Sequence, residues 1–123
     1  MSITLNSKVY NAIGWNQNQQ FVYNETSAGV PSGFSYLTTK VGLGTGKTNT
    51  MVKWNLTMPI VALEASECAC PGDPLRSYFG KFELTIPAGS TLAERTDYYN
   101  RIVALVATTE FANSVKGLVQ PNS

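Results

Sequence analysis

An alternation of apolar and polar residues, repeated in three segments, constrains the fold of this chain more than any other feature. The segments are residues 34–43, 51–58 and 75–87. Successive side chains of a β-strand point to opposite sides of a sheet, so each segment is predicted to be a strand with one apolar and one polar face. In the middle segment the apolar face would hold Val52, Trp54, Leu56 and Met58, and the polar face Met51, Lys53, Asn55 and Thr57. The sequence therefore predicts a sheet that turns only one face to a core.

The stretch GLGTGKTNT, residues 42–50, joins the first two of these strands and contains the Gly-Lys-Thr that ends a phosphate-binding loop. That loop needs four residues between its two glycines, and the position this spacing selects is Val41. A strand follows the motif, whereas a phosphate-binding loop leads into a helix. The stretch is therefore interpreted as a hairpin turn, with glycines that supply positive φ angles.

The N-terminal third favours shorter strands. Residues 2–13 are expected to form a hairpin that turns near Asn6 to Lys8, and residues 20–25 another strand. Residues 26–33 are rich in Gly, Pro and Ser and are expected to form a loop, as are residues 65–74.

Two residues are expected to disturb the long strands. Pro59 has no amide hydrogen, so it is expected to end or border strand pairing. Gly80 lies within its strand and is expected to mark a β-bulge, which leaves open whether Tyr78 or Phe79 faces the polar side.

The spacing becomes helical after Pro87. Thr91 and Glu94 fit a capping box, and a second, shorter helix is predicted for residues 110–116, ending at Gly117. The apolar residues at helical spacing in the first helix are Leu92, Tyr99, Ile102, Val103 and Val106. Strands followed by helices make an α+β domain, and 123 residues make one domain, 1–123. Because one chain offers few helical residues to cover its sheet, helices from a second copy are inferred to complete the core.

Composition argues against an enzyme. The chain has no histidine, the commonest general base near neutral pH, and the sequence contains no evident nucleophile and base pair. We expect no cofactor, no metal site and no small-molecule substrate. No apolar run is long enough for a membrane-spanning helix, and the first residues lack a signal-peptide layout. We therefore expect synthesis and use in a cytosol, or release by lysis rather than secretion. The net charge is only +1, but Lys40, Lys47 and Lys53 fall in a stretch, between Glu25 and Glu64, that has no acidic residue. A local basic surface is therefore predicted.

The two cysteines, Cys68 and Cys70, are too close in sequence for an unstrained bond within one chain. They also cannot complete a four-ligand zinc site alone. Free thiols and disulfides to another chain both remain open.

The run from Arg76 to Pro87, RSYFGKFELTIP, resembles the last sheet strand of the coat proteins of small single-stranded RNA bacteriophages. The loop CACPGDP, residues 68–74, is similar to the loop before that strand in the branch with disulfide-linked capsids. Three further segments also resemble that branch, namely residues 90–95, the run ALVA at 104–107 and the Asn- and Pro-containing tail. The resemblance covers about residues 33–123.

The resemblance implies a fold and a function. The fold would be α+β, with an N-terminal β-hairpin, a five-stranded antiparallel sheet and two C-terminal helices, in an interlocked homodimer. The protein would be a structural capsid protein that assembles in the bacterial host cytoplasm into an icosahedral, T=3-type virion around the phage RNA genome. A dimer would also bind an RNA hairpin operator, which represses replicase translation and starts packaging. The alternative is a dimeric RNA-binding translational regulator that never assembles.

The resemblance also implies site residues. The RNA-binding positions would be Thr38, Lys40, Lys53, Asn55, Thr57, Lys81 and Glu83, with Tyr78 or Phe79 as the base-stacking aromatic. Cys68 and Cys70 would form inter-subunit disulfides. Two strand positions that are more basic in the family are here Tyr36 and Gly42, which leaves open the identity of the bound hairpin and the strength of repression.

Overall fold

The computed structural model describes residues 2–62 and 74–120, in which six strands form one antiparallel sheet in sequence order. The strands are β1 (Ser2–Leu5), β2 (Lys8–Trp15), β3 (Phe21–Glu25), β4 (Ser35–Gly42), β5 (Thr50–Val61) and β6 (Pro74–Ile86). A 3₁₀ turn, η1 (Pro31–Gly33), precedes β4, and the helices α1 (Leu92–Val106) and α2 (Thr109–Lys116) follow β6. The predicted α+β class, with an N-terminal hairpin and two C-terminal helices, is confirmed.

The N-terminal hairpin belongs to the same sheet. Asn6 and Ser7, with φ angles of 49° and 66°, make the tight turn between β1 and β2. β2 then pairs with β3 through a bulge between Ala12 and Gly14. Besides the hairpin, the described residues contain the four strands β3 to β6 rather than the five expected. The link between β2 and β3 is a turn, in which the side-chain oxygen of Asn16 accepts hydrogen bonds from the amides of residues 18 and 20.

A small core lies where the hairpin folds over the apolar face of the sheet. Its buried members are Tyr10, Tyr23 and Leu37, and Ile3, Leu5, Phe21, Trp54 and Leu56 pack against them. The Tyr10 hydroxyl lies 2.7 Å from Ser35 Oγ, which in turn donates to the backbone oxygen of Thr57 at 2.7 Å. The hydroxyl of Tyr10 is therefore satisfied inside the core, as a buried polar group requires.

Of the two expected disturbances of the long strands, the bulge at Gly80 is wrong and the border at Pro59 is confirmed in part. β5 continues past Pro59, which pairs with Ser77. The pairing of β4 with β5 ends at Thr57, so Pro59 lies where β5 has a neighbour on one side only and its missing amide hydrogen breaks no ladder. β6 also pairs with β5 in continuous register across Gly80, and the shift occurs only between Ile60 and Val61.

The turn between β4 and β5 is a hairpin turn, as predicted, but its glycines do not take positive φ angles. The turn is held by threonines instead. The amide of Thr45 donates to Thr48 Oγ1 at 2.7 Å, and the amide of Gly44 donates to Thr50 Oγ1 at 3.0 Å. Gly44 is required for space, because a Cβ at this position would collide with the backbone oxygen of Thr48.

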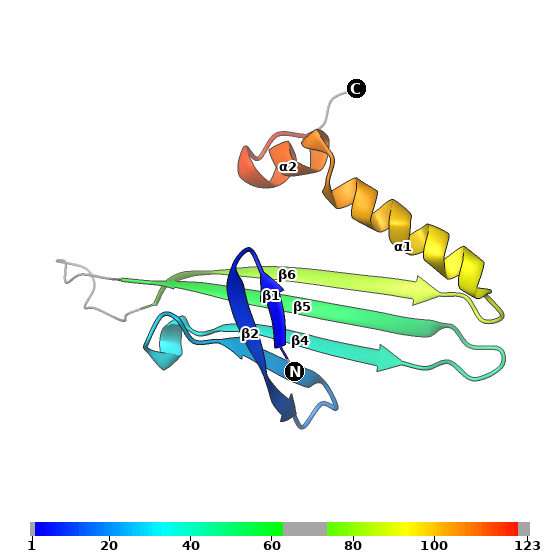
Figure 1. Ribbon diagram of the computed structural model, residues 1–123, viewed down its shortest axis with the longest axis horizontal. Coiled ribbons are helices and arrows are strands. Elements are labelled where there is room, and N and C mark those ends of the chain that lie inside the picture. Colours follow the sequence, from blue (N-terminus) through cyan, green and yellow to red (C-terminus); the bar gives the residue numbers. More distant parts are fainter. Residues whose placement is uncertain (1, 63–73, 121–123) are drawn as a thin grey trace.

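The two helices stand away from the sheet (Figure 1). The capping box is confirmed, since Thr91 Oγ1 accepts from the amide of Glu94 while the Glu94 carboxylate accepts from the amide of Thr91. α2 is capped by Thr108, and Gly117 follows its last residue, as predicted. Neither helix has a buried residue. The apolar side chains of α1 are therefore not part of a core formed by residues 2–62 and 74–120.

Candidate nucleic-acid interface

The polar face of the sheet is a grid, because residues directly opposite each other in antiparallel strands turn their side chains to the same face. Three rows cross β4, β5 and β6. We name them the aromatic row (Tyr36, Thr57, Phe79), the amide row (Thr38, Asn55, Lys81) and the lysine row (Lys40, Lys53, Glu83). Adjacent members of a row have Cβ atoms about 5 Å apart. Eight of the nine residues predicted for RNA binding thus share one surface.

The remaining predicted residue, Tyr78, pairs with Met58 and lies on the opposite, apolar face. Since β6 runs through Gly80 without a bulge, Phe79 is the member of this pair that faces the polar side. Its side chain is 73% exposed. The strand register therefore decides which of the two aromatic residues faces the polar side, and it is Phe79.

The lysine row puts two like charges directly opposite each other, which destabilises a sheet unless the charges find other partners. Here each ammonium group has one. Lys40 Nζ lies 3.4 Å from the backbone oxygen of Asn18, in the turn after β2, whereas Lys53 Nζ lies 4.0 Å from Glu83 Oε1. The two ammonium groups therefore point away from each other, Lys40 toward the turn after β2 and Lys53 toward β6.

The ion pair of Lys53 with Glu83 is weak. The side chains are 44% and 59% exposed, and exposed pairs of this kind contribute about 0.2–1 kcal/mol. Glu83 is also the one acidic side chain that the described strands β3 to β6 place on the polar face, against three lysines. The surface is therefore weakly cationic, and Lys53 remains available to an anionic ligand.

The amide row offers groups suited to reading bases. A hydroxyl and a carboxamide, from Thr38 and Asn55, lie next to the ammonium group of Lys81. Hydroxyls and amides can donate to and accept from the edges of unpaired bases, and an ammonium group neutralises a phosphate. The row thus combines neutral hydrogen-bonding groups with one cationic group.

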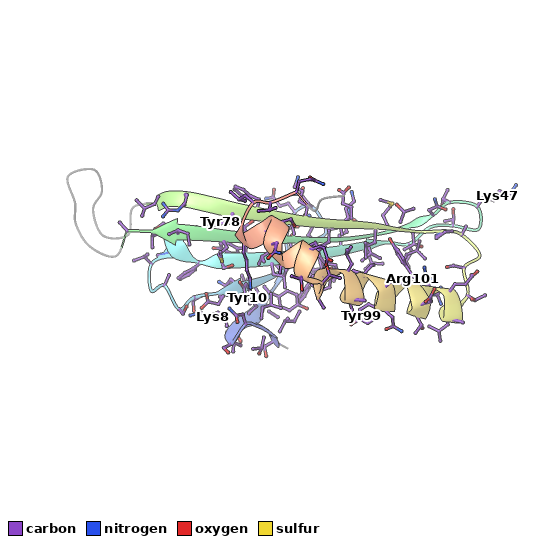
Figure 2. All side chains as sticks on the ribbon, turned by 90° about the horizontal axis from the view of Figure 1, so that it is seen from above. Lys8, Tyr10, Lys47, Tyr78, Tyr99 and Arg101 are labelled. Carbon is purple, nitrogen blue, oxygen red and sulfur yellow. The ribbon has the colours of Figure 1, made fainter. Side chains whose placement is uncertain are left out.

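Lys47 extends the cationic surface beyond the strands. Figure 2 shows it at the tip of the turn between β4 and β5. The residue that the sequence reasoning left out is Tyr36. Its alternation with Leu37 placed it on the polar face, and its exposed ring could have been recognised there as an aromatic contact.

The described residues contain no group of three or more metal-ligating side chains. Neither α1 nor α2, the helices of the described chain, is long and apolar enough to cross a membrane. The prediction for Cys68 and Cys70 falls outside the described residues.

Comparison with known proteins relates this fold to phage particles. No protein-family model matches the sequence, and no curated protein matches it. The virus-like particle of Beihai levi-like virus 21 is similar in structure, with a TM-score of 0.83 at 13% identity, over 100% of this chain and 96% of that chain. The virus-like particle of bacteriophage NT-214 has a TM-score of 0.82 at 13% sequence identity, over 99% of this chain and 95% of that chain. The virus-like particle of bacteriophage ESE058 has a TM-score of 0.80 at 16% sequence identity, over 99% of this chain and 95% of that chain. The chain has the fold of the subunits of these particles over nearly its full length.

Proposed function

We propose that this chain is the structural capsid protein of a single-stranded RNA bacteriophage. It assembles as homodimers into an icosahedral, T=3-type shell around the genome, and it acts in the virion. The observation that carries the proposal is the shared fold with subunits of phage virus-like particles across 99% or more of the chain. The resemblance of residues 76–87 to a coat-protein strand supports the same function independently.

The unburied apolar side chains support the homodimer. On α1, Tyr99 and Val103 are 64% and 45% exposed, and on the apolar face of the sheet Tyr78 and Phe82 are 54% and 46% exposed. Contiguous exposed apolar surface of this kind marks an interface. The helices of one chain, laid over the sheet of another, would bury both surfaces at once.

The outer edge of β6 supports the same arrangement. β6 is the last strand of the sheet and, at 13 residues, its longest. An unpaired edge of this length invites pairing with another strand. Two copies that join along β6 would form one continuous sheet, with a single polar face shared between them.

The polar face is proposed to bind RNA. A dimer would bind an RNA hairpin through it, repress replicase translation and start packaging. Lysines on all of β4, β5 and β6 can neutralise phosphates, and Phe79 offers a stacking surface to an unpaired base. A coat subunit with this face turned inward would hold its genome there.

Expression of the protein alone in bacteria tests the proposal. We expect uniform spherical particles by negative-stain electron microscopy and nuclease-protected RNA in the same fraction. A homogeneous dimer that binds RNA but forms no particles would favour the non-assembling regulator. Particles without RNA would contradict the role of the polar face.

Replacement of Lys53 with Gln separates RNA binding from assembly. A lysine that contacts a phosphate contributes about one unit to the slope of log K against log salt concentration, so Lys53→Gln should reduce this slope by about 1. The control is Lys8→Gln, because Lys8 lies on β2, outside the three strands that carry the rows. Equal slopes for the two variants would argue against this face as the site.

We also propose that Cys68 and Cys70 form disulfides between neighbouring dimers once particles reach an oxidising medium. The proposal follows from the similarity of their loop to that of disulfide-linked capsids. Purified particles should give cross-linked ladders in non-reducing electrophoresis that collapse to monomer with reductant. Monomer bands alone, without reductant, would contradict it.

A further inference from the structure

The aromatic row carries two exposed rings, of which the proposed function uses one. Thr57 lies directly opposite Tyr36 on one side and Phe79 on the other. Tyr36 is 37% exposed and Phe79 is 73% exposed. Within the described residues, aromatic pairs occur only among Trp15, Phe21 and Tyr23, so neither of these rings is paired with another aromatic ring. The Tyr36 hydroxyl has no hydrogen-bond partner among the described residues.

The spacing of the rings determines what they can bind. Tyr36 and Phe79 lie two strands apart, which corresponds to about 9.5 Å between their backbones. Stacked bases along a strand follow each other at about 3.4 Å. A single base between two rings needs them about 7 Å apart, so one base cannot stack on both rings, whereas two bases can each stack on one ring. The row therefore suits two unpaired bases, one against each ring.

We infer that Tyr36 is a second base-stacking residue, which takes an unpaired base other than the one on Phe79. This inference rests on the proposed RNA-binding function. Asn24, on β3, lies directly opposite Tyr36 on its other side. Its carboxamide is placed to hydrogen-bond the edge of a base on the Tyr36 ring. The ligand is thus single-stranded RNA, or a loop or bulge of a hairpin, with at least two unpaired bases.

Stacking and phosphate contacts respond differently to salt, which separates this row from the lysine row. A neutral ring that stacks on a base releases no counterions from the RNA phosphates. Loss of the ring should therefore weaken binding without changing the slope of log K against log salt concentration. Loss of a phosphate-binding lysine should change the slope. Tyr36 and Lys40, both on β4, therefore provide a matched pair of positions.

The first experiment measures binding of oligoadenylates of increasing length to the full-length protein. Tyr36→Leu keeps an apolar side chain but removes the ring, and we expect it to weaken binding of the longer oligomers about tenfold with an unchanged salt slope. Tyr36→Phe keeps the ring and should bind within about twofold of the unchanged protein. Oligomers too short to reach both rings should bind Tyr36→Leu and the unchanged protein equally.

Equal affinity of Tyr36→Leu and the unchanged protein for long oligomers would overturn the inference and leave the proposed function standing. Equal loss in the Phe and Leu variants would also overturn it, because the hydroxyl would then be the contact. If the unchanged protein binds no RNA, the proposed function itself fails.

A second experiment needs no variant. Photocrosslinking of the unchanged protein to RNA that carries bromouracil, followed by mass spectrometry, should locate crosslinks at both Tyr36 and Phe79. Crosslinks at Phe79 without any at Tyr36 would overturn the inference even if Tyr36→Leu fails to fold.

Discussion

The two halves of the chain differ in how far they bury their apolar residues. In the N-terminal half the hairpin closes over the sheet, and Tyr10, Tyr23 and Leu37 are each 5–6% exposed. In the C-terminal half α1 and α2 bury no residue, and the apolar side of β6 remains open. Figure 1 makes the contrast visible, with the hairpin crossing the long strands while the helices stand off.

This difference indicates where the fold depends on a second copy. The N-terminal core depends on contacts within one chain, so mutations there should act on the stability of each subunit. The C-terminal half depends on apolar surfaces that face outward, so mutations there should act first on association.

The largest effect is expected on α1. Val103→Asp should abolish dimers and particles, because it would place an unpaired charge in the proposed interface. Tyr99 and Val106, one helical turn away on either side, share this apolar stripe. Sedimentation velocity measures the result. The matched control is Ala104→Asp, which adds the same charge on the opposite side of the helix and should leave dimers intact. Loss of dimers in both variants would contradict the proposed stripe.

In the N-terminal core, Leu37→Ala should lower the free energy of unfolding by about 2–5 kcal/mol, because it leaves a cavity beside Tyr10 and Tyr23. Urea unfolding followed by circular dichroism measures this loss. Leu43→Ala makes the same chemical change in the turn, where the side chain is 81% exposed, and should cost less than about 0.5 kcal/mol. Similar losses in both variants would argue against a core closed within one chain.

A smaller effect on stability is expected at the start of α1, where the sheet is joined to the helices. Thr91→Ala should cost about 1 kcal/mol, since it removes the acceptor of the Glu94 amide at the start of α1. Thr96→Ala is the control, because Thr96 Oγ1 bonds the backbone oxygen of Leu92 within the helix, where alanine is the better helix former. Thermal unfolding should rank Thr91→Ala below the unchanged protein and Thr96→Ala at or above it. The reverse order would show that the capping box contributes nothing.

The smallest effect concerns pH and lies in the N-terminal half. Hydrogen bonds from Ser27 lower the pKa of the Glu25 carboxyl below its ordinary value of 4.5. A lowered pKa in the folded state means that this stabilisation is present above the unfolded pKa and is lost as pH falls through the folded pKa. In Glu25→Gln the free energy of unfolding should therefore fall slightly less steeply as pH is lowered. Denaturant unfolding at several acidic pH values measures this dependence. A steeper fall would contradict the sign.

Alternation and capping chemistry are local, and they predicted most of this fold. The facing of Lys53 and Asn55 and the start of α1 at Thr91 follow from the nearest neighbours in sequence. Pairing register is not local. Whether Pro59 ends β5 depends on where β4 begins, and whether Phe79 or Tyr78 faces the lysines depends on continuous pairing through Gly80. The grid of rows, and with it the place of Tyr36, emerges only when four strands are aligned.

If a second copy completes the C-terminal half, the thermal stability of the protein must depend on its concentration. Subunits are kept below the concentration at which particles form, and thermal unfolding is followed across a wide range of dilution. We expect one transition whose midpoint rises with protein concentration, with a dimer mass before it, because association and folding are then linked. A midpoint independent of concentration, with a folded monomer before the transition, would contradict it.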